Sequence, residues 1–519
     1  MSRRRIVAVI GAASLAVGLA SAAAAYAARP SVREALPASA RGAILGHLHV
    51  SPAQRVIAHN LPQTRSGLKA HMRPALGRNG KPAGSGLPSR PSTGTKPGAR
   101  GASSRAVTGP KIIDTQFNGI ALGTSDCGCQ PPDSNATIGP NAILETVNLE
   151  FAVYSKTGSL QFRTSLNNFL GTPDGLSDPR AVYDPTWNRW EFSLTDTSSP
   201  SLWLVYSQTS DPLGAWWIYH VGFPFAQGSI VDYPQVGMND VSFFYTSNNF
   251  DPNENYLNST AFSVPKARVY NGFGWGAGLP GVNFNTTPAI VGGYPTQQTN
   301  ATFMLSPGNN VMNVYAWTNT AEAPTLTFKG AINYTWSPPS RRVNQPGTST
   351  TLDPLDGRIV WAVAQLDGRL WFAHGVDLVG FPAVNYGFVA PGNMTIHVNT
   401  AFHSATSDDF NPSISVTDRP DGKALLVVNW AYTDSPNNIP TTTSYASTVG
   451  VAVPHLAGGP YSSGGGITSE FRFGDYSSVW PEYNTVGSCA PGEEMLVTNE
   501  YFAPNGTWRT RLARVHGAC

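Results

Sequence analysis

A short pattern that recurs about every sixty residues constrains the fold of this chain more than any other feature. Each copy has an Asp or Asn, then a Pro, Tyr or Ser, then a short β-rich run and a polar turn, and a second β-rich run follows. The clear copies contain Asp133, Asp178, Asp232, Asn411 and Asp475. With divergent copies near residues 302 and 358, about seven units fill roughly 400 residues. Such units bury their apolar faces only against one another.

The runs between the turns are typical of strands. Residues 202–207 and 241–246, for example, are rich in aromatic and β-branched side chains. No amphipathic helix of about twelve or more residues is found, which excludes parallel α/β folds. The sequence therefore predicts an all-β fold, a β-propeller of about seven blades, although six or eight blades would also fit. A pair of β-sandwiches is the alternative, but sandwiches do not need a similar acidic start in every unit.

The net charge of +2 hides a strong segregation of charge. Residues 1–110 hold sixteen Lys/Arg and one acid, a net of +15, whereas residues 111–519 hold eighteen Lys/Arg and thirty-one acids, a net of −13. Residues 28–110 are rich in Gly, Pro and Ser and lack Phe, Trp and Tyr, so we expect a disordered basic leader. This leader could be a solvated spacer, a contact to anionic envelope polymers, or a pro-segment that lies on the acidic body.

The first 27 residues are typical of a secretory signal peptide. Arg3, Arg4 and Arg5 precede an apolar stretch that ends at Ala25-Tyr-Ala27. A membrane anchor is the alternative, but the stretch is short and diluted by Gly and Ala. The start also fits twin-arginine export. The predicted organisation is thus a signal peptide (1–27), a basic leader (28–110) and a propeller (111–519), secreted or envelope-associated, with no transmembrane segment after signal removal and no nucleic-acid partner.

The repeated acids supply the main candidate site. The first strands of propeller blades line a central channel, so Asp133, Asp178, Asp232 and Asp475 are candidate catalytic residues on one rim. Glycosidic cleavage needs two carboxyl groups roughly 5–10 Å apart, and Glu482 and Glu500 are further candidate acids. The candidate ligand-binding residues are Arg180, Trp190, Asn411, Arg472 and Glu482. The same acids could instead bind a cation or hold turns by accepting backbone N–H groups.

Cation and cysteine chemistry are less defined. The loops 251–255 and 408–411 are rich in oxygen ligands and could hold Ca²⁺, but neither matches an EF-hand. No zinc-hydrolase, nucleophile-elbow or phosphate-loop motif is found. Four cysteines in an exported chain predict disulfides. We favour Cys489 with Cys519, whereas a pair between Cys519 and Cys127 or Cys129 would join the two ends of the ring.

Several of these stretches resemble a known group of proteins. They are Pro131-Pro-Asp-Ser-Asn135, Asp178-Pro179, Asp232-Tyr-Pro234, Arg472-Phe-Gly-Asp-Tyr-Ser-Ser478 and Asn499-Glu-Tyr501. They resemble a group of largely uncharacterised exported bacterial β-propeller proteins, over about residues 114–515, and the resemblance carries no settled activity. Residues 209–216 are distantly similar to the Asp-box turn of sialidase-type propellers, with the Gly one place late. An Asp-box is a structural turn. A sialidase-like site needs three arginines that converge on one carboxylate, and the twelve arginines after residue 170 are scattered without such a group.

Three functions are consistent with this sequence. The first is an exported, monomeric propeller that recognises extracellular ligands, above all glycans, at its channel face. The second is a glycoside hydrolase with paired carboxylates at the channel mouth. The third is an envelope-associated structural or adhesion protein. A close carboxyl pair in an open pocket would favour the enzyme, and a filled, narrow channel would favour the scaffold.

Overall fold

The computed structural model describes residues 41–63, 76–89, 95–96, 104–106, 113–123, 128–292, 299–321, 323–450, 456–462, 464–484 and 489–516. The described residues belong to one compact unit. The signal peptide predicted over residues 1–27, Cys127 and Cys519 lie outside the described residues. No helix among the described residues is long and apolar enough to cross a membrane.

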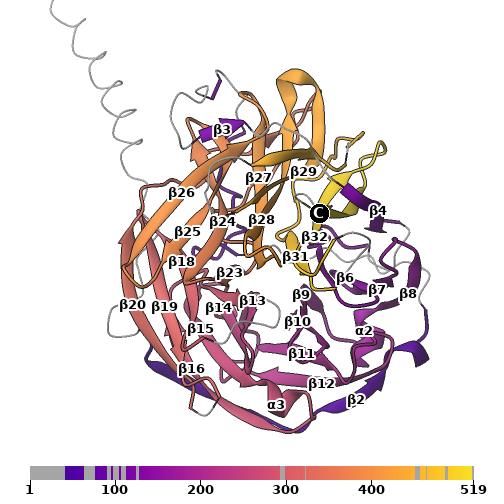
Figure 1. Ribbon diagram of the computed structural model, residues 1–519, viewed down its shortest axis with the longest axis vertical. Helices are drawn as coiled ribbons and strands as arrows, with labels where there is room; N and C mark the ends of the chain where they lie inside the picture. The colour runs from indigo at the N-terminus through magenta and orange to yellow at the C-terminus, as the bar shows by residue number, and fades with distance from the viewer. Residues whose placement is uncertain are drawn as a thin grey trace, which may run out of the picture. The chain divides into compact units, whose positions relative to one another are not determined.

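Seven antiparallel four-stranded units follow one another along the chain (Figure 1). The first three are β5(Asn135–Ile138), β6(Ile143–Val147), β7(Glu150–Tyr154), β8(Leu160–Ser165); β9(Leu176–Asp184), β10(Arg189–Asp196), β11(Ser201–Ser207), β12(Ala215–Gly222); and β13(Ile230–Met238), β14(Ser242–Phe250), β15(Tyr256–Pro265), β16(Trp275–Val282). The next three are β17(Thr287–Val291), β18(Thr302–Gly308), β19(Val311–Thr318), β20(Thr325–Asn333); β23(Val363–Leu366), β24(Arg369–Leu378), β25(Phe381–Ala390), β26(Thr395–Phe402); and β27(Asp408–Asp418), β28(Ala424–Asp434), β29(Ile439–Val449), β30(Ala457–Pro460). The last unit is β31(Ser478–Glu482), β32(Glu494–Phe502), β33(Trp508–His516) and β4(Ile113–Ala121).

The first strands of the seven units form a closed ring. Contacts run from β5 to β9, β13, β17, β23, β27 and β31, and from β31 back to β5. The ring is closed at its outer edge where β4, from the start of the body, pairs antiparallel with the C-terminal strand β33. The chain is therefore a seven-bladed β-propeller, which confirms the predicted fold class and excludes the pair of sandwiches.

In three of its copies the repeated sequence pattern is a β-bulge in the inner strand. Asp178, Tyr233 and Asn411 have positive φ angles of 59°, 53° and 50°, and each directly precedes a proline. The register of the neighbouring strand shifts opposite all three. A bulge of this kind bends the strand and turns a side chain in a new direction. Tyr233, and not its neighbour Asp232, is thus the structural equivalent of Asp178.

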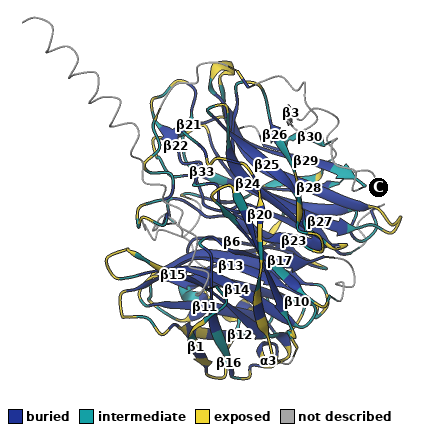
Figure 2. Ribbon diagram, turned by 90° about the vertical axis from the view of Figure 1, so that its left-hand side faces the viewer, coloured by how far each residue is buried: buried dark blue, intermediate teal, exposed yellow. Residues whose placement is uncertain are grey.

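The core lies between neighbouring blades, where buried residues concentrate in the strands and exposed ones at turns and edges (Figure 2). For example, Phe151 on β7 of the first blade packs against Phe192 on β10 and Trp216 on β12 of the second, with ring centroids 5.5–6.0 Å apart. The remaining elements are short: α2(Leu166–Leu170), α3(Lys266–Val269), the 3-10 turns η2(Ala58–Asn60) and η3(Ser435–Asn437), and the strands β21(Val343–Asn344) and β22(Thr351–Leu352).

The described parts of the basic leader are ordered, which differs from the disorder predicted over residues 28–110. The strand β1(Ile44–Val50) pairs with β16, β2(Gln54–Ile57) pairs with β12, and β3(Ser104–Ala106) pairs with β26. The outermost strand of a blade offers unpaired backbone groups. The leader therefore needs no core of its own in these segments, because the propeller supplies both hydrogen-bond partners and an apolar surface.

Candidate functional site

Three of the four predicted rim carboxylates meet at the centre of the ring. The Asp475 backbone N–H donates to Asp133 Oδ1 at 2.7 Å. Asn148 Nδ2 donates to Asp133 Oδ2 at 2.6 Å, and Asn148 Oδ1 accepts the Asp178 N–H at 2.9 Å. All these side chains are buried. The inner strands thus bring together residues that lie up to 342 positions apart in the chain.

Arg472 anchors the same cluster. Arg472 Nη2 donates to both carboxylate oxygens of Asp475 at 2.6 Å, and Arg472 Nη1 lies 3.4 Å from Asp353 Oδ2. The Gly474 N–H donates to Glu500 Oε2 at 2.6 Å. Arg472 therefore lies where the sequence predicted a ligand-binding arginine, but its charge is used to hold Asp475.

Arg180 is a buried cation without a carboxylate partner among the described residues. Its Nε donates to Pro234 O at 3.1 Å and its Nη2 to Val360 O at 3.0 Å. Its Nη1 has no partner in the described part of the chain. The guanidinium carbon lies 3.8 Å from the centroid of the Tyr476 ring, a cation–π contact.

Two tyrosines extend this contact into a column of rings and guanidinium groups. The Tyr476 and Tyr233 centroids are 5.0 Å apart, and Arg358 lies 4.3 Å from the Tyr233 centroid. Arg358 Nε pairs with Asp356 Oδ1 at 2.8 Å. The Tyr476 hydroxyl donates to Asp178 Oδ2 at 2.6 Å, which links the column to the carboxylates.

Asp232, the fourth predicted carboxylate, is covered by the leader. The Leu76 N–H donates to Asp232 Oδ2 at 2.9 Å, and Leu76 O accepts from Arg358 Nη2 at 3.0 Å. Farther along the leader, a Cβ on Gly84 would lie 1.9 Å from Asp353 Oδ1, so only glycine allows this approach. The leader therefore lies directly against Asp232 and Asp353.

Burial sets the protonation of the cluster. Burial, with nearby Asp178, raises the pKa of Asp232 to about 8, and burial raises the pKa of Asp353 to about 7. Burial and the charge of Asp475 raise the pKa of Asp133 and of Asp178. Burial lowers the pKa of Arg180. At neutral pH the centre of the ring thus offers both protonated carboxyl groups and hydrogen-bond acceptors.

Of the other predicted ligand-binding residues, only Asn411 joins the cluster. Its Nδ2 donates to Gly474 O at 2.7 Å, and its Oδ1 has no partner among the described residues. Trp190 is fully buried against Tyr183, with centroids 4.8 Å apart, and belongs to the core. Glu482, at the other end of β31, pairs with Lys156 at 2.7 Å and lies outside the cluster.

The sequence prediction missed several members of the cluster: Asn148, Asp353, Asp356, Arg358, Tyr233 and Tyr476. Both tyrosines directly follow an Asp of the repeated pattern, which is a signal that could have found them. Asp353 and Asp356 belong to the divergent fifth unit, where no clear copy of the pattern marks them.

The two oxygen-rich loops engage groups of the protein itself. Asp251 Oδ1 accepts the N–H groups of Asn253 and Asn255, both at 2.8 Å. Asp408 is held by Arg341, and Asp409 pairs with Lys96 at 2.7 Å. The carboxylates considered for Ca²⁺ therefore have protein partners, and cation binding at these loops stays a prediction.

Neither described cysteine, Cys129 nor Cys489, carries a free thiol. Cys489 lies within 4.8 Å of ligand atoms of Asp114 and His516, and His516 Nε2 is 3.0 Å from Asp114 Oδ1. Because Cys489 has no free thiol, this group lacks the thiolate that a metal would take. The predicted disulfide pairing involves Cys127 and Cys519 and stays a prediction.

The segment that is similar to an Asp-box is a turn between β11 and β12. Asp211 Oδ1 accepts the Leu213 N–H at 2.9 Å, and Asp211 O accepts the Gly214 N–H at 3.1 Å. Trp216 is fully buried, and its Nε1 donates to Pro212 O at 2.9 Å. This segment is structural and lies apart from the cluster.

The fold and site define a seven-bladed propeller with a buried carboxylate–arginine centre. No protein-family model matches the chain, and no curated protein matches it. Solved structures similar to it include a protein of unknown function from Dyadobacter fermentans (11% identity, 79% of this chain and 99% of that chain, TM-score 0.37). They also include a Trypanosoma rangeli sialidase (10% identity, 78% and 60%, TM-score 0.37) and a Penicillium chrysogenum α-L-arabinanase (9% identity, 55% and 92%, TM-score 0.30). With these low TM-scores, the propeller assignment rests on the ring of strands described above.

Proposed function

We propose that this propeller recognises an extracellular glycan at its channel face, with the central cluster as the binding site. The observation that carries the proposal is the convergence of Asp133, Asp178, Asp232 and Asp475 from different blades on one cluster. The cluster also holds Arg180, a cation without a carboxylate partner among the described residues. Buried polar atoms without partners in the described residues, Arg180 Nη1, Glu500 Oε1 and Asn411 Oδ1, are costly unless a polar ligand or water satisfies them. Sugar hydroxyl groups both donate and accept hydrogen bonds, as this mixture of groups requires.

Binding of a panel of polysaccharides to the full-length protein tests this proposal. The full chain is used because β1 and β2 of the leader belong to the folded unit. Asp178→Asn and Asp232→Asn should weaken binding about two- to tenfold, since a hydrogen bond between neutral groups contributes roughly 0.5–1.5 kcal/mol. Asp421→Asn, in an exposed turn, is the matched control. Absence of binding by the wild type, or unchanged binding by both variants, would contradict the proposal.

A glycoside hydrolase is the second candidate, and one observation favours it. Asp232 has a pKa raised to about 8, whereas Asp475 in the same cluster is held by both oxygens on Arg472. Carboxyl groups whose environments differ in this way are suited to act as acid and base. Hydrolysis assays on the same panel test this: Asp232→Asn and Asp475→Asn should each abolish turnover, and no turnover by the wild type on any substrate removes the candidate.

The proposed binder is an exported, disulfide-containing monomer. The evidence for export is the signal-peptide pattern that ends at Ala27. Adhesion through a free basic leader is less favoured, because the described leader lies on the propeller and Lys96 is buried with Asp409. N-terminal sequencing of the secreted protein tests export, and a start directly after Ala27 is the expected result.

A further inference from the structure

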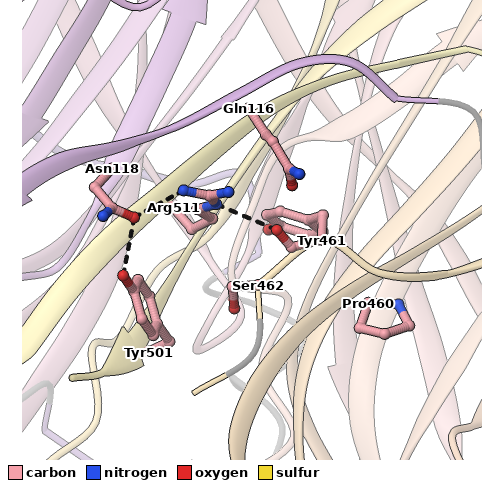
Figure 3. A pocket seen from close by; sticks show the side chains of 7 residues that line it. All are labelled: Gln116, Asn118, Pro460, Tyr461, Ser462, Tyr501 and Arg511. Atoms are coloured by element: carbon pink, nitrogen blue, oxygen red, sulfur yellow. Dashed lines mark hydrogen bonds between the residues drawn. The ribbon is translucent and has the colours of Figure 1, made fainter. Parts of the chain in front are cut away.

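A polar cavity lies away from the ring centre, between the outer parts of the sixth and seventh blades (Figure 3). It has a volume of about 330 Å³ and is lined by Gln116, Asn118, Pro460, Tyr461, Ser462, Tyr501 and Arg511. These residues come from β4, β32 and β33 of the last blade and from β30 and the residues that follow it in the sixth blade. The cavity therefore adjoins the pair β4–β33 that closes the ring.

Strand geometry explains why the polar groups meet. Arg511 on β33 is paired with Asn118 on β4, so their side chains lie on the same face of the sheet. Gln116 lies two residues before Asn118 and shares that face. Asn118 Oδ1 accepts from both Arg511 Nη1 and Tyr501 Oη, each at 2.9 Å.

Arg511 has no carboxylate partner among the described residues and keeps N–H donors that make no hydrogen bond there. Its Nε donates to Tyr461 O at 3.2 Å and its Nη1 to Asn118 Oδ1 at 2.9 Å. A guanidinium group has five N–H donors, so about three remain, and no carboxylate pairs with Arg511 among the described residues. By contrast, Arg514 on the same strand is paired with Glu494. Burial lowers the pKa of Arg511, a sign that its charge is poorly compensated.

We propose that this cavity is a binding site for a small carboxylate ligand, with Arg511 as the residue that pairs with the carboxylate. Arginine binds carboxylates through two parallel N–H bonds, and Arg511 keeps enough donors for such a contact. The Gln116 and Asn118 amides line the same cavity and offer hydrogen bonds to hydroxyl groups. The volume lies near the lower end of the roughly 300–1,000 Å³ range of ligand pockets, which suits a single sugar acid or a small organic acid. The proposal does not depend on the function proposed for the ring centre.

Calorimetric titration of the full-length protein with glucuronate, acetate and glucose tests this site. Glucuronate should bind, and Arg511→Gln should weaken the binding at least about tenfold, since the lost charge-assisted contact contributes roughly 1.5–3 kcal/mol. Arg509→Gln, two residues earlier on β33 and outside the lining, should bind glucuronate like the wild type. Similar affinity for acetate would identify a simple carboxylate as sufficient, and preference for glucuronate would identify a sugar acid; both support the site.

Three results would overturn the proposal: no glucuronate binding by the wild type up to about 10 mM, glucose binding as tightly as glucuronate, or equal glucuronate affinity in Arg511→Gln and wild type. Thermal unfolding of each variant confirms that it is folded. Binding is measured directly in this experiment, so its result is independent of the polysaccharide panel used for the ring centre.

Discussion

The buried ion pair between Lys96 and Asp409 gives the sharpest test of how the leader is held. Lys96 Nζ lies 2.7 Å from Asp409 Oδ2, and both side chains are fully shielded from solvent, with an exposed fraction of 0%. Removing one partner of a buried pair costs about 3–5 kcal/mol, because a buried charge loses its compensation. Asp409 keeps three donors in Lys96→Met, from Ser407, His403 and Trp430. We therefore expect a loss near the lower end of this range, about 3 kcal/mol.

This free energy converts into a measurable change in melting temperature. At roughly 2.1 cal/mol/K per residue, an ordered unit of about 400 residues has an unfolding entropy of about 0.8 kcal/mol/K. Lys96→Met should then lower the Tm of the full-length protein by about 4 °C in differential scanning calorimetry. The double variant Lys96→Met with Asp409→Asn should recover part of the loss, since it leaves no unpaired charge.

The matched control is Lys329→Met, on an exposed position of β20. Its Tm should stay within about 1 °C of the wild type, as is usual for surface substitutions. If Lys96→Met behaved like this control, the leader would not be docked on the sixth blade, and the reasoning from burial would be refuted.

Three further predictions concern protonation, ring closure and covalent links. The pKa of Asp232 is raised from 3.8 to about 8 in the folded protein, so the free energy of unfolding falls as pH rises from about 4 to 8. Asp232→Asn should therefore be more stable than the wild type at pH 8 but not at pH 4, as measured by urea unfolding at both pH values. Gly119→Ala on β4 would place a Cβ 2.4 Å from Glu145 Oε2, and the resulting overpacking should destabilise the protein by roughly 1–3 kcal/mol; an unchanged denaturation midpoint would contradict the described closure. Peptide mapping without reduction should find Cys489 linked to Cys519, because Cys489 lies beside His516, three residues before the chain ends; a different partner would refute this pairing.

The sequence carried enough information to predict the architecture. The Asp or Asn before Pro in two copies marks the bulge of the inner strand, and the positive φ of Asp178 and Asn411 shows why a short polar residue suits that position. Asp133, Asp178 and Asp475 are joined through shared hydrogen-bond partners at the inner strands, and the catalytic role expected of them stays a prediction. Glu482 was placed with them because it follows the same copy of the pattern. Glu482 nevertheless lies at the far end of the five-residue strand β31, where it pairs with Lys156 and not with the central cluster.

The basic leader shows the limit of composition as evidence. Its sequence lacks the large apolar residues of a core, which predicts disorder when the segment is considered alone. The outer strands of the blades nonetheless supply backbone partners to β1 and β2, and Asp409 and Asp232 supply acceptors to Lys96 and Leu76. Ordering here depends on surfaces built by residues hundreds of positions away.

The sequence by itself determined an all-β repeat fold of about seven units, a ring of inner-strand acids and the segregation of positive and negative charge. Only the tertiary structure decided which charges are paired. It placed the Leu76 N–H against Asp232 and paired Arg472 and Arg358 with carboxylates. It left Arg180 and Arg511 without a carboxylate partner among the described residues. The physical reason is that local backbone preference sets strands and bulges, whereas ion pairing depends on distances between blades that no local pattern records.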